Sequence, residues 1–368
     1  MAQKSKILQI SSYPPPRAGW GIRVEFLKKR LIADGHECVV LNTGSSRKIP
    51  SPEYDTVLDG NDYFRKVLKY CRAGYIPHVH INGATLKGLL LTLIAQLVSL
   101  AHGRRAFLTF HAGTEQVYFP RSRAWRLVPV YALMFALSRK IVCNSEAVKA
   151  RICEYGVSPD KVVPIPAFST QYLDSPTVPI GDTLERFYQR FRYVLFCYTA
   201  YRPLFYPVEI IEAFAELCRH RDDVGLALCG GGGYTEGGLK ETVRDRIAAH
   251  DLHERTVMID DLPHDVFLSA LARASLYVRS HMSDGVCSSI LEALSLGVPV
   301  VASENGTRPP GVIKYDVRDS SALARVLEGV LSDYDAVRAR VVPPAVHDTL
   351  SEEVALLTSQ PVREVQPA

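Results

Sequence analysis

Residues 279–306 have the sequence RSHMSDGVCSSILEALSLGVPVVASENG, and this stretch decides the fold. It starts at the end of the apolar run LYVRS, which is typical of a buried strand, and it turns at Asp284. A helical pattern follows and ends at Gly297, directly before the second apolar run PVVAS. A strand, a helix and a strand in this order form one unit of a parallel sheet.

The start of this helix is a candidate binding site for an anion. The first backbone N–H groups of a helix have no partner inside it, and the helix dipole places roughly half a positive charge there. Ser288 or Ser289 is suited to cap this end. A diphosphate would accept bonds from these N–H groups, while the carboxylates of Asp284 and Glu292 would accept bonds from sugar or ribose hydroxyls. Alternatively, Asp284 only complements the helix dipole, and Glu292 lies on a solvated face.

The same alternation of strands and helices runs through the whole chain. In the first half, the predicted strands are ILQIS, CVVLN, HVHIN, AFLTF, KIVCN and VVPIP, and the predicted helices span 21–33, 86–101, 124–138 and 146–154. In the second half, the predicted strands are YVLFCYT, GLALCG, TVMID, LYVRS and PVVAS, and the predicted helices span 207–219, 239–249, 265–273, 288–296 and 321–331. We therefore predict an α/β protein with two Rossmann-like, doubly wound parallel-sheet domains.

The domain boundaries follow from where this pattern stops and restarts. Residues 1–168 form the predicted N-terminal domain and residues 190–342 the predicted C-terminal domain, with a less patterned stretch, 169–189, between them. Residues 343–368 hold one predicted helix over 350–358 and a polar end. Because ligands of open parallel sheets bind beyond the carboxyl ends of the strands, we expect the two domains to face each other across an interdomain cleft.

Two further candidates follow strands of the first domain. Gly19 and Gly21 lie in the turn between the first strand and its helix, where glycine lets backbone N–H groups approach a phosphate or a carboxylate. A tight turn packed against the sheet explains them equally well. His111 directly follows AFLTF, and a histidine there can donate a hydrogen bond to a substrate hydroxyl or stabilise charge. A structural role is the alternative for His111.

The composition argues against several classes of protein. The net charge is +4 over 368 residues, with acids and bases interspersed, so nucleic-acid binding is not indicated. The first residues contain only a short apolar run and no small-residue cleavage site, so we expect a cytoplasmic protein. The eight cysteines show no metal-ligand spacing, so we interpret them as buried thiols and predict no metal site.

Two apolar segments bear on membrane contact. Residues 121–140, RSRAWRLVPVYALMFALSRK, combine an apolar centre with basic flanks and a tryptophan. This pattern suits a helix lying on an anionic membrane surface, and it suits a buried crossover helix equally well. Residues 89–100 are mainly apolar but too short to span a membrane, and they predict a core helix.

Together these motifs resemble the retaining glycosyltransferases of the GT-B fold, family 4. That family has paired acids of the form E-x7-E followed by EAxAxGxPVVA, and this chain has D-x7-E followed by EALSLGVPVVAS. The other motifs follow in the family's order: the first glycine loop and GHE, HVHING, FHAG, IVCNSEAVKARICEYGVSPDKVVPIP and the glycine run after GLALC. The resemblance covers roughly residues 5–335.

The resemblance implies a role for each candidate residue. Glu292 would bind the ribose of the nucleotide, Asp284 would contact hydroxyls of the transferred sugar, and His111 would line the sugar pocket. The phosphates would be held by the backbone of four successive residues, Gly285, Val286, Cys287 and Ser288. The first glycine loop, with Gly19 and Gly21, would also contact the donor.

The chain departs from the family pattern at three points. Asp284 is one methylene shorter than the usual Glu, and Cys287 replaces a glycine and narrows the phosphate site. The Arg and Lys that the family places after the first strand of the second domain align with Ala200 and Phe205. We predict that Arg202, the only cation of that segment, replaces both as a bidentate phosphate clamp. A surface salt bridge is the alternative for Arg202.

The implied activity is the transfer of a hexose or related sugar from a nucleotide-sugar donor to a glycan or lipid-linked acceptor, as in bacterial surface polysaccharide synthesis. The family implies retention of configuration. Aligned N–H dipoles and a guanidinium would stabilise the leaving diphosphate, and Asp260-Asp261 does not match a DxD cation site, so neither a metal nor a cofactor is expected. Two other functions stay open: a nucleotide-sugar epimerase or phosphorylase on the same scaffold, and a non-catalytic nucleotide-sugar-binding subunit.

Overall fold

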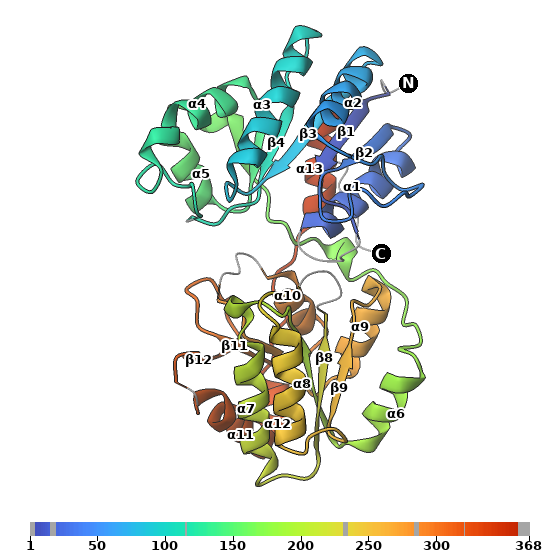
Figure 1. Cartoon of the computed structure of the whole chain (residues 1–368), viewed down its shortest axis with the longest axis vertical. Coiled ribbons are helices and arrows are strands. Elements are labelled where there is room, and N and C mark those ends of the chain that lie inside the picture. Colours follow the sequence, from blue (N-terminus) through green and yellow to red (C-terminus); the bar gives the residue numbers. More distant parts are fainter. Residues whose placement is uncertain are drawn as a thin grey trace. The chain divides into compact units, whose positions relative to one another are not determined.

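The computed structural model describes residues 4–14, 20–114, 116–230, 235–282, 287–319 and 321–359 (Figure 1). The chain divides into two compact units: unit 1 comprises Met1–Ser169 with His347–Ala368, and unit 2 comprises Thr170–Val346. Each unit contains a six-stranded sheet. All strand pairs within both sheets are parallel, so the predicted pair of doubly wound α/β sheets is confirmed.

The sheet of unit 1 has the spatial order β2-β1-β3-β4-β5-β6. Its strands are β1 Lys6–Ser11, β2 Glu37–Asn42, β3 Ile76–Ile81, β4 Phe107–Phe110, β5 Ile141–Cys143 and β6 Val162–Pro164. Most of their residues are buried, because apolar clusters lie on both faces of the sheet. The chain winds in opposite directions from β1 toward β2 and toward β3, so the topological switch point of unit 1 lies between β1 and β3.

The helices of unit 1 follow the predicted pattern with one addition. They are α1 Trp20–Ala33, α2 Gly60–Arg72, α3 Leu86–Ala101, α4 Val128–Leu137, α5 Glu146–Cys153 and α13 Thr349–Thr358. The helix α2 was not predicted, because its mainly polar composition hides the buried positions Tyr63, Val67 and Cys71. The predicted helix over 124–138 starts as a 3-10 turn, η1 Trp125–Leu127, before α4.

The last helix of the chain, α13, packs into unit 1. Leu350, Val354 and Leu357 are buried against residues of the first strand, the first helix and β4. Figure 1 shows α13, coloured red, among the blue elements of unit 1. This packing brings the two ends of the described chain into one core.

The helix α3 was predicted as a core helix, and only one of its faces is buried. Leu86, Leu90, Leu97 and Leu100 are 53%, 59%, 51% and 42% exposed and recur at helical spacing on the outer side. The inner face carries polar residues that find partners there: Gln96 Nε2 donates to Met134 O and Ser138 Oγ of the α4 region, both at 2.9 Å. In the part of the chain that the structure describes, no helix is long and apolar enough to span a membrane.

The sheet of unit 2 has the spatial order β12-β11-β10-β7-β8-β9. Its strands are β7 Tyr193–Tyr198, β8 Val224–Cys229, β9 Thr256–Ile259, β10 Leu276–Arg279, β11 Val300–Ser303 and β12 Ile313–Tyr315. The helices are α6 Asp182–Arg190, α7 Pro207–Cys218, α8 Leu239–Ala249, α9 His264–Arg273, α10 Ser288–Ser295, α11 Ala322–Ser332 and α12 Tyr334–Ala339. The switch point of unit 2 lies between β7 and β10.

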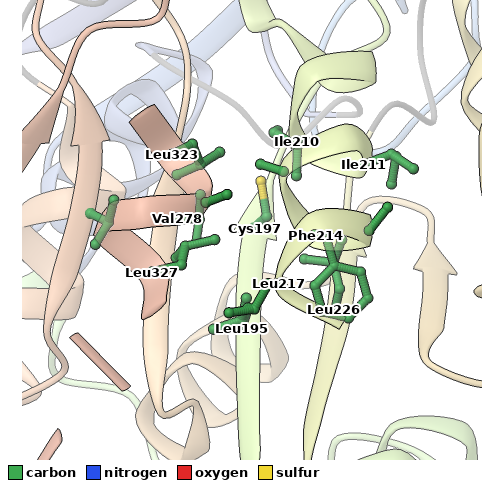
Figure 2. Packing of buried hydrophobic residues seen from close by; sticks show 14 of the residues in the cluster. Leu195, Cys197, Ile210, Ile211, Phe214, Leu217, Leu226, Val278, Leu323 and Leu327 are labelled. Atoms are coloured by element: carbon green, nitrogen blue, oxygen red, sulfur yellow. The ribbon is translucent and has the colours of Figure 1, made fainter. Parts of the chain in front are cut away.

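The core of unit 2 forms where the central strands meet the helices on one face. Figure 2 shows Leu195 and Cys197 of β7 and Val278 of β10 facing apolar side chains of α7 and α11. Cys197 is fully buried, and burial raises its thiol pKa to about 12, so it packs as a small apolar side chain. The eight cysteines are free thiols, of which Cys38, Cys71, Cys143, Cys197 and Cys229 are buried.

Three elements of unit 2 were absent from the prediction: α6, α12 and β12. The helix α6 lies in the stretch that we described as less patterned, and it buries only Leu184 and Phe187. The helix α12 has six residues, and none of them is buried. The strand β12 has three residues, too few for a period of two to be visible in the sequence. The elements α6 and β12 form because unit 2 offers an apolar surface or a strand edge for them to cover.

Candidate functional site

His111 lies directly after β4, at the carboxyl edge of the sheet of unit 1. Its backbone N–H donates to Ile81 O of the neighbouring β3 at 2.7 Å, which fixes its place beside the switch point. The half-buried imidazole packs on Trp20, with ring centroids 4.6 Å apart. Trp20 begins α1, and its Nε1 donates to Ser12 Oγ after β1. The strand ends of β1 and β4 and the start of α1 therefore meet at one place.

Of the two candidate glycines of the first loop, the structure describes only Gly21. Gly21 is buried in the first turn of α1, next to Trp20. A Cβ atom at Gly21 would make only ordinary contacts, the nearest with Pro14 Cδ at 3.6 Å, so packing alone does not require glycine there. Gly19 lies outside the described residues.

A buried polar network that was not predicted from the sequence connects to His111. His80 of β3 bonds to His111 through its Nδ1 at 2.9 Å and to Gln9 Oε1 of β1 through its Nε2 at 2.7 Å. His78 Nε2 lies 2.7 Å from Thr109 Oγ1 of β4. Thr109 in turn donates to Glu353 Oε1 of α13 at 3.2 Å. The signal in the sequence was HVHIN, in which two histidines alternate along a predicted strand and so share one face.

An ion pair between the two ends of the chain completes this network. Arg23 of α1 bonds to Glu353 of α13 at 2.7 Å, and their side chains are only 3% and 2% exposed. The guanidinium also donates to Thr349 Oγ1 at 3.0 Å and to Thr349 O at 2.8 Å. Each charge is thus both paired and hydrogen-bonded, as a buried ion pair requires.

Burial sets the charge state of these histidines. It lowers the pKa of His78 to about 4 and of His111 to about 3, and it lowers the pKa of His80 well below its usual value. All three imidazoles are therefore neutral at pH 7. Of the two roles expected for His111, hydrogen bonding to a hydroxyl remains compatible with this state, whereas a standing positive charge does not.

Glu292 lies in α10 of unit 2 and is only 4% exposed. His264 at the start of α9 holds it, with His264 Nε2 at 3.0 Å from Glu292 Oε1. The alternative that Glu292 lies on a solvated face is therefore wrong. His264 was not predicted from the sequence, because the two residues lie 28 positions apart and only the packing of α9 against α10 brings them together.

The start of α10 differs from the prediction. Cys287 occupies the N-cap position, and among the residues that the structure describes no side chain caps this helix, so the prediction that Ser288 or Ser289 is the cap is wrong. The hydroxyl of Ser289 instead accepts from Tyr277 Oη at 2.6 Å. Ser288 is the first residue of α10. Asp284, Gly285 and Val286 lie outside the described residues.

Arg202 lies between β7 and α7. It is exposed and occupies the N-cap position of the 3-10 turn η4 Pro203–Phe205, with its backbone N–H donating to Ala200 O at 2.8 Å. The loop that carries Arg202 follows β7, which is one of the two strands at the switch point of unit 2. The glycine run after β8 starts at Gly230, where a Cβ atom would lie 2.4 Å from Thr199 O. Glycine is required there by the close approach of the two strand ends.

Two buried arginines near these strand ends were missed. Arg279 ends β10; its Nη1 donates to Tyr198 O at 3.1 Å, and its guanidinium lies over the rings of Tyr198 and Phe205. Arg308 follows β11 and donates from Nε to Ser303 O at 2.8 Å and from Nη2 to His281 O at 2.5 Å. In the sequence, both arginines are far from the segment after β7. In the sheet, β10 is the neighbour of β7, so the end of β10 lies beside that segment.

Comparison with known proteins gives matches to both halves of the chain. A family described as "Glycosyl transferases group 1" matches residues 190–342, and one described as "Glycosyltransferase Family 4" matches residues 18–168. The chain is 24% identical over 379 residues to a subunit of the phosphatidylinositol N-acetylglucosaminyltransferase of Arabidopsis thaliana. That alignment covers 95% of this chain and 78% of the plant protein.

Solved structures share the fold over nearly the whole length. A glycosyltransferase from Rickettsia africae matches with a TM-score of 0.67 at 15% identity, covering 96% of this chain and 98% of that one. Anabaena HepE in complex with UDP-glucose matches with a TM-score of 0.64 at 15% identity, covering 96% and 94%. A Listeria monocytogenes protein assigned as a UDP-N-acetylglucosamine 2-epimerase matches with a TM-score of 0.66 at 18% identity, covering 97% and 96%.

Proposed function

The chain belongs to the group 1 glycosyltransferases, with the GT-B fold, and on this premise we propose its reaction. The protein moves a hexose or related sugar from a nucleotide-sugar donor to a glycan or lipid-linked glycan acceptor, with retention of configuration. The observation that carries this proposal is the pair formed by the buried Glu292, within α10, and His264, at the start of α9. A carboxylate held out of water beside a strand-to-helix turn is suited to bind a ligand hydroxyl.

Glu292 binds the ribose of the donor nucleotide in this proposal. Its Oε1 is engaged by His264, which orients the carboxylate, and the second oxygen accepts a hydrogen bond from a ribose hydroxyl. In support, the donor complexes among the structural neighbours contain UDP or UDP-glucose. Asp284 contacts hydroxyls of the transferred sugar, as the family pattern implies.

The diphosphate is held by the backbone N–H groups of 285–288 and by Arg202. Its negative charge grows as the bond to the anomeric carbon breaks, and N–H dipoles together with a guanidinium stabilise that charge without a metal. Among the described residues no group of three or more His, Cys, Asp and Glu side chains is arranged to hold a metal ion. As the family pattern implies, His111 of unit 1 lines the sugar pocket and Gly21 contacts the donor.

Of these two acceptors we propose the lipid-linked one, and we propose that unit 1 contacts the membrane surface that carries it. Support comes from the residues 63–145, which hold twelve Lys and Arg but a single acid, Glu115. Trp125 within 121–140 is 70% exposed, and the outer face of α3 carries the exposed leucines described above. An apolar surface with basic side chains is suited to an anionic bilayer. The Arabidopsis relative is named for a lipid substrate, phosphatidylinositol.

The test separates this reaction from its rivals. A thermal-shift screen of nucleotide sugars identifies the donor through ligand-linked stabilisation, and radiolabelled donor is then offered with and without membrane lipid extract. Transfer of label to lipid only when acceptor is present supports the proposal. Conversion of the donor sugar without acceptor would identify an epimerase, and binding without turnover would identify a non-catalytic binding protein.

A paired substitution tests the ribose contact. Glu292→Gln removes the charge and is expected to weaken donor binding at least about tenfold, the effect of about 1.4 kcal/mol. Glu304→Gln is the matched control, because Glu304 is an exposed acid of the same unit that pairs with Lys314. Equal donor affinity in both variants would remove Glu292 from the site.

A further inference from the structure

A hydrogen-bonded chain of three side chains, Gln9, His80 and His111, links the interior of unit 1 to the carboxyl edge of its sheet. Gln9 is fully buried and His80 is 8% exposed. The parallel register places Gln9 beside His78 and His80 beside Thr109, so these side chains share one face of the sheet. The links are 2.7 Å from Gln9 Oε1 to His80 Nε2 and 2.9 Å from His80 Nδ1 to His111 Nε2.

Each of these hydrogen bonds contains one proton, and this fixes how the protons are arranged. A neutral imidazole has one donor nitrogen and one acceptor nitrogen. The Gln9 amide is oriented with Oε1 toward His80, and in this orientation the oxygen only accepts, so His80 carries its proton on Nε2 and presents a lone pair on Nδ1. The bond to His111 must then be donated by His111 Nε2. His111 Nδ1 is left without a proton.

The neighbouring His78 is held by a separate set of bonds. The Thr109 hydroxyl donates to Glu353, so its oxygen accepts from His78 Nε2. The ring centroids of His78 and His80 lie 4.2 Å apart, but no hydrogen bond joins the two rings in the part of the chain that the structure describes. Protons on His78 are therefore arranged independently of the Gln9–His80–His111 chain.

The ring of His111 is also fixed in orientation. It stacks on His80 with an interplanar angle of 16° and packs on Trp20 with an interplanar angle of 55°. Among the described residues no hydrogen bond engages His111 Nδ1. This nitrogen is therefore the end of the Gln9–His80–His111 chain and the atom that can bind a ligand.

We propose that Gln9 and His80 are positioning residues that hold His111 as its Nε2–H tautomer, so that Nδ1 accepts a hydrogen bond from a sugar hydroxyl. This inference rests on the proposed function for the identity of the ligand, and on the geometry of unit 1 for the tautomer. It reverses the direction expected from the sequence, in which His111 donates. His111 orients a hydroxyl and carries no proton to it.

Nitrogen-15 NMR of the ligand-free protein tests the tautomer directly. The wild-type His111 is expected to show a pyridine-like Nδ1 and a pyrrole-like Nε2, with the same pattern for His80. Gln9→Met removes the acceptor and is expected to shift His111 toward a mixture of tautomers. A wild-type His111 protonated on Nδ1 would overturn the proposal, and this spectrum decides even if Gln9→Met does not fold.

The matched control is His78→Gln, which alters a buried histidine of the same strand outside the chain. It is expected to leave the His111 nitrogen shifts unchanged. In the transfer assay Gln9→Met is expected to lower kcat about tenfold, the loss of about 1.4 kcal/mol at the transition state, while His78→Gln changes kcat little. Equal effects of both variants on the His111 shifts would show a purely structural role. The NMR result does not depend on transfer, so a failed transferase assay leaves it standing.

Discussion

Arg23 and Glu353 lie 330 positions apart in the sequence and form a 2.7 Å ion pair whose side chains are 3% and 2% exposed. The pair joins α1 to α13 and connects through Thr109 to His78. A charge in such a place is tolerated only while its partner is present. The last helix of the chain is therefore a structural part of the first unit.

We expect Glu353→Gln to destabilise unit 1 by about 3–5 kcal/mol, because it leaves the Arg23 charge buried without its carboxylate. Both tryptophans, Trp20 and Trp125, lie in unit 1, so fluorescence-detected urea unfolding reports on this unit alone. Arg151→Ala is the control: its pair with Glu154 is 48% and 39% exposed and should contribute at most about 1 kcal/mol. Similar losses in the two variants would contradict the structural role of the buried pair.

The stability of unit 1 is expected to fall on mild acidification. The pKa of His78 is lowered to about 4 by burial, an effect that the nearby Glu353 carboxylate opposes and Arg23 strengthens. In the unfolded chain the histidine has a pKa of about 6.5, so between about pH 6.5 and 4 it binds a proton that His78 of the folded unit does not bind. The contribution of the neutral histidine to the free energy of unfolding is thus complete above about pH 6.5. It is lost as the pH falls toward 4, by about 1.4 kcal/mol per pH unit for each such histidine.

Tryptophan-detected unfolding at a series of pH values measures this slope. His78→Gln is expected to reduce it, because one of the buried histidines no longer titrates in the unfolded state. A free energy of unfolding that is the same at pH 7 and at about pH 5 would show that these imidazoles accept protons in the folded unit.

Arg202→Ala is expected to raise the donor dissociation constant by about tenfold or more, because one charge-assisted clamp on the diphosphate is lost. Isothermal titration with the donor found by the thermal-shift screen measures it. Arg186→Ala serves as control, since Arg186 is an exposed arginine of α6 in the same unit. An unchanged constant for Arg202→Ala would exclude this residue, and the buried Arg279 would become the next cation to test.

Contact with an anionic bilayer is expected to depend on the outer face of α3. Leu90→Glu combined with Leu97→Glu should reduce co-sedimentation with vesicles containing acidic lipid, and high salt should reduce binding of the wild type as Lys and Arg contacts of about 1 kcal/mol each are screened. Leu204→Glu is the control, because Leu204 is 51% exposed but lies in unit 2. Absence of wild-type binding at low salt would exclude the membrane proposal.

The sequence predicted most of the fold because its strands are buried on both faces and its helices are long enough to show their period. The helix over 86–101 and the doubly wound α/β fold class needed no tertiary information. It failed at α2, α6, α12 and β12, which are short or mainly polar and form only against a surface that the rest of the unit provides. It also failed at the cap of α10, since the Ser289 hydroxyl bonds to Tyr277 of a neighbouring strand instead.

By itself, the sequence determined that two parallel sheets form, that His111 follows a strand and that Glu292 lies in the helix after a strand, because apolar period and strand-end position are local properties of a chain. Tertiary structure alone decided the partners of these residues. Parallel pairing set Gln9, His80 and His111 in one line, and helix packing put His264 on Glu292 and α13 on Arg23. Hydrogen bonds between residues far apart in sequence depend on register and packing, which no local pattern encodes.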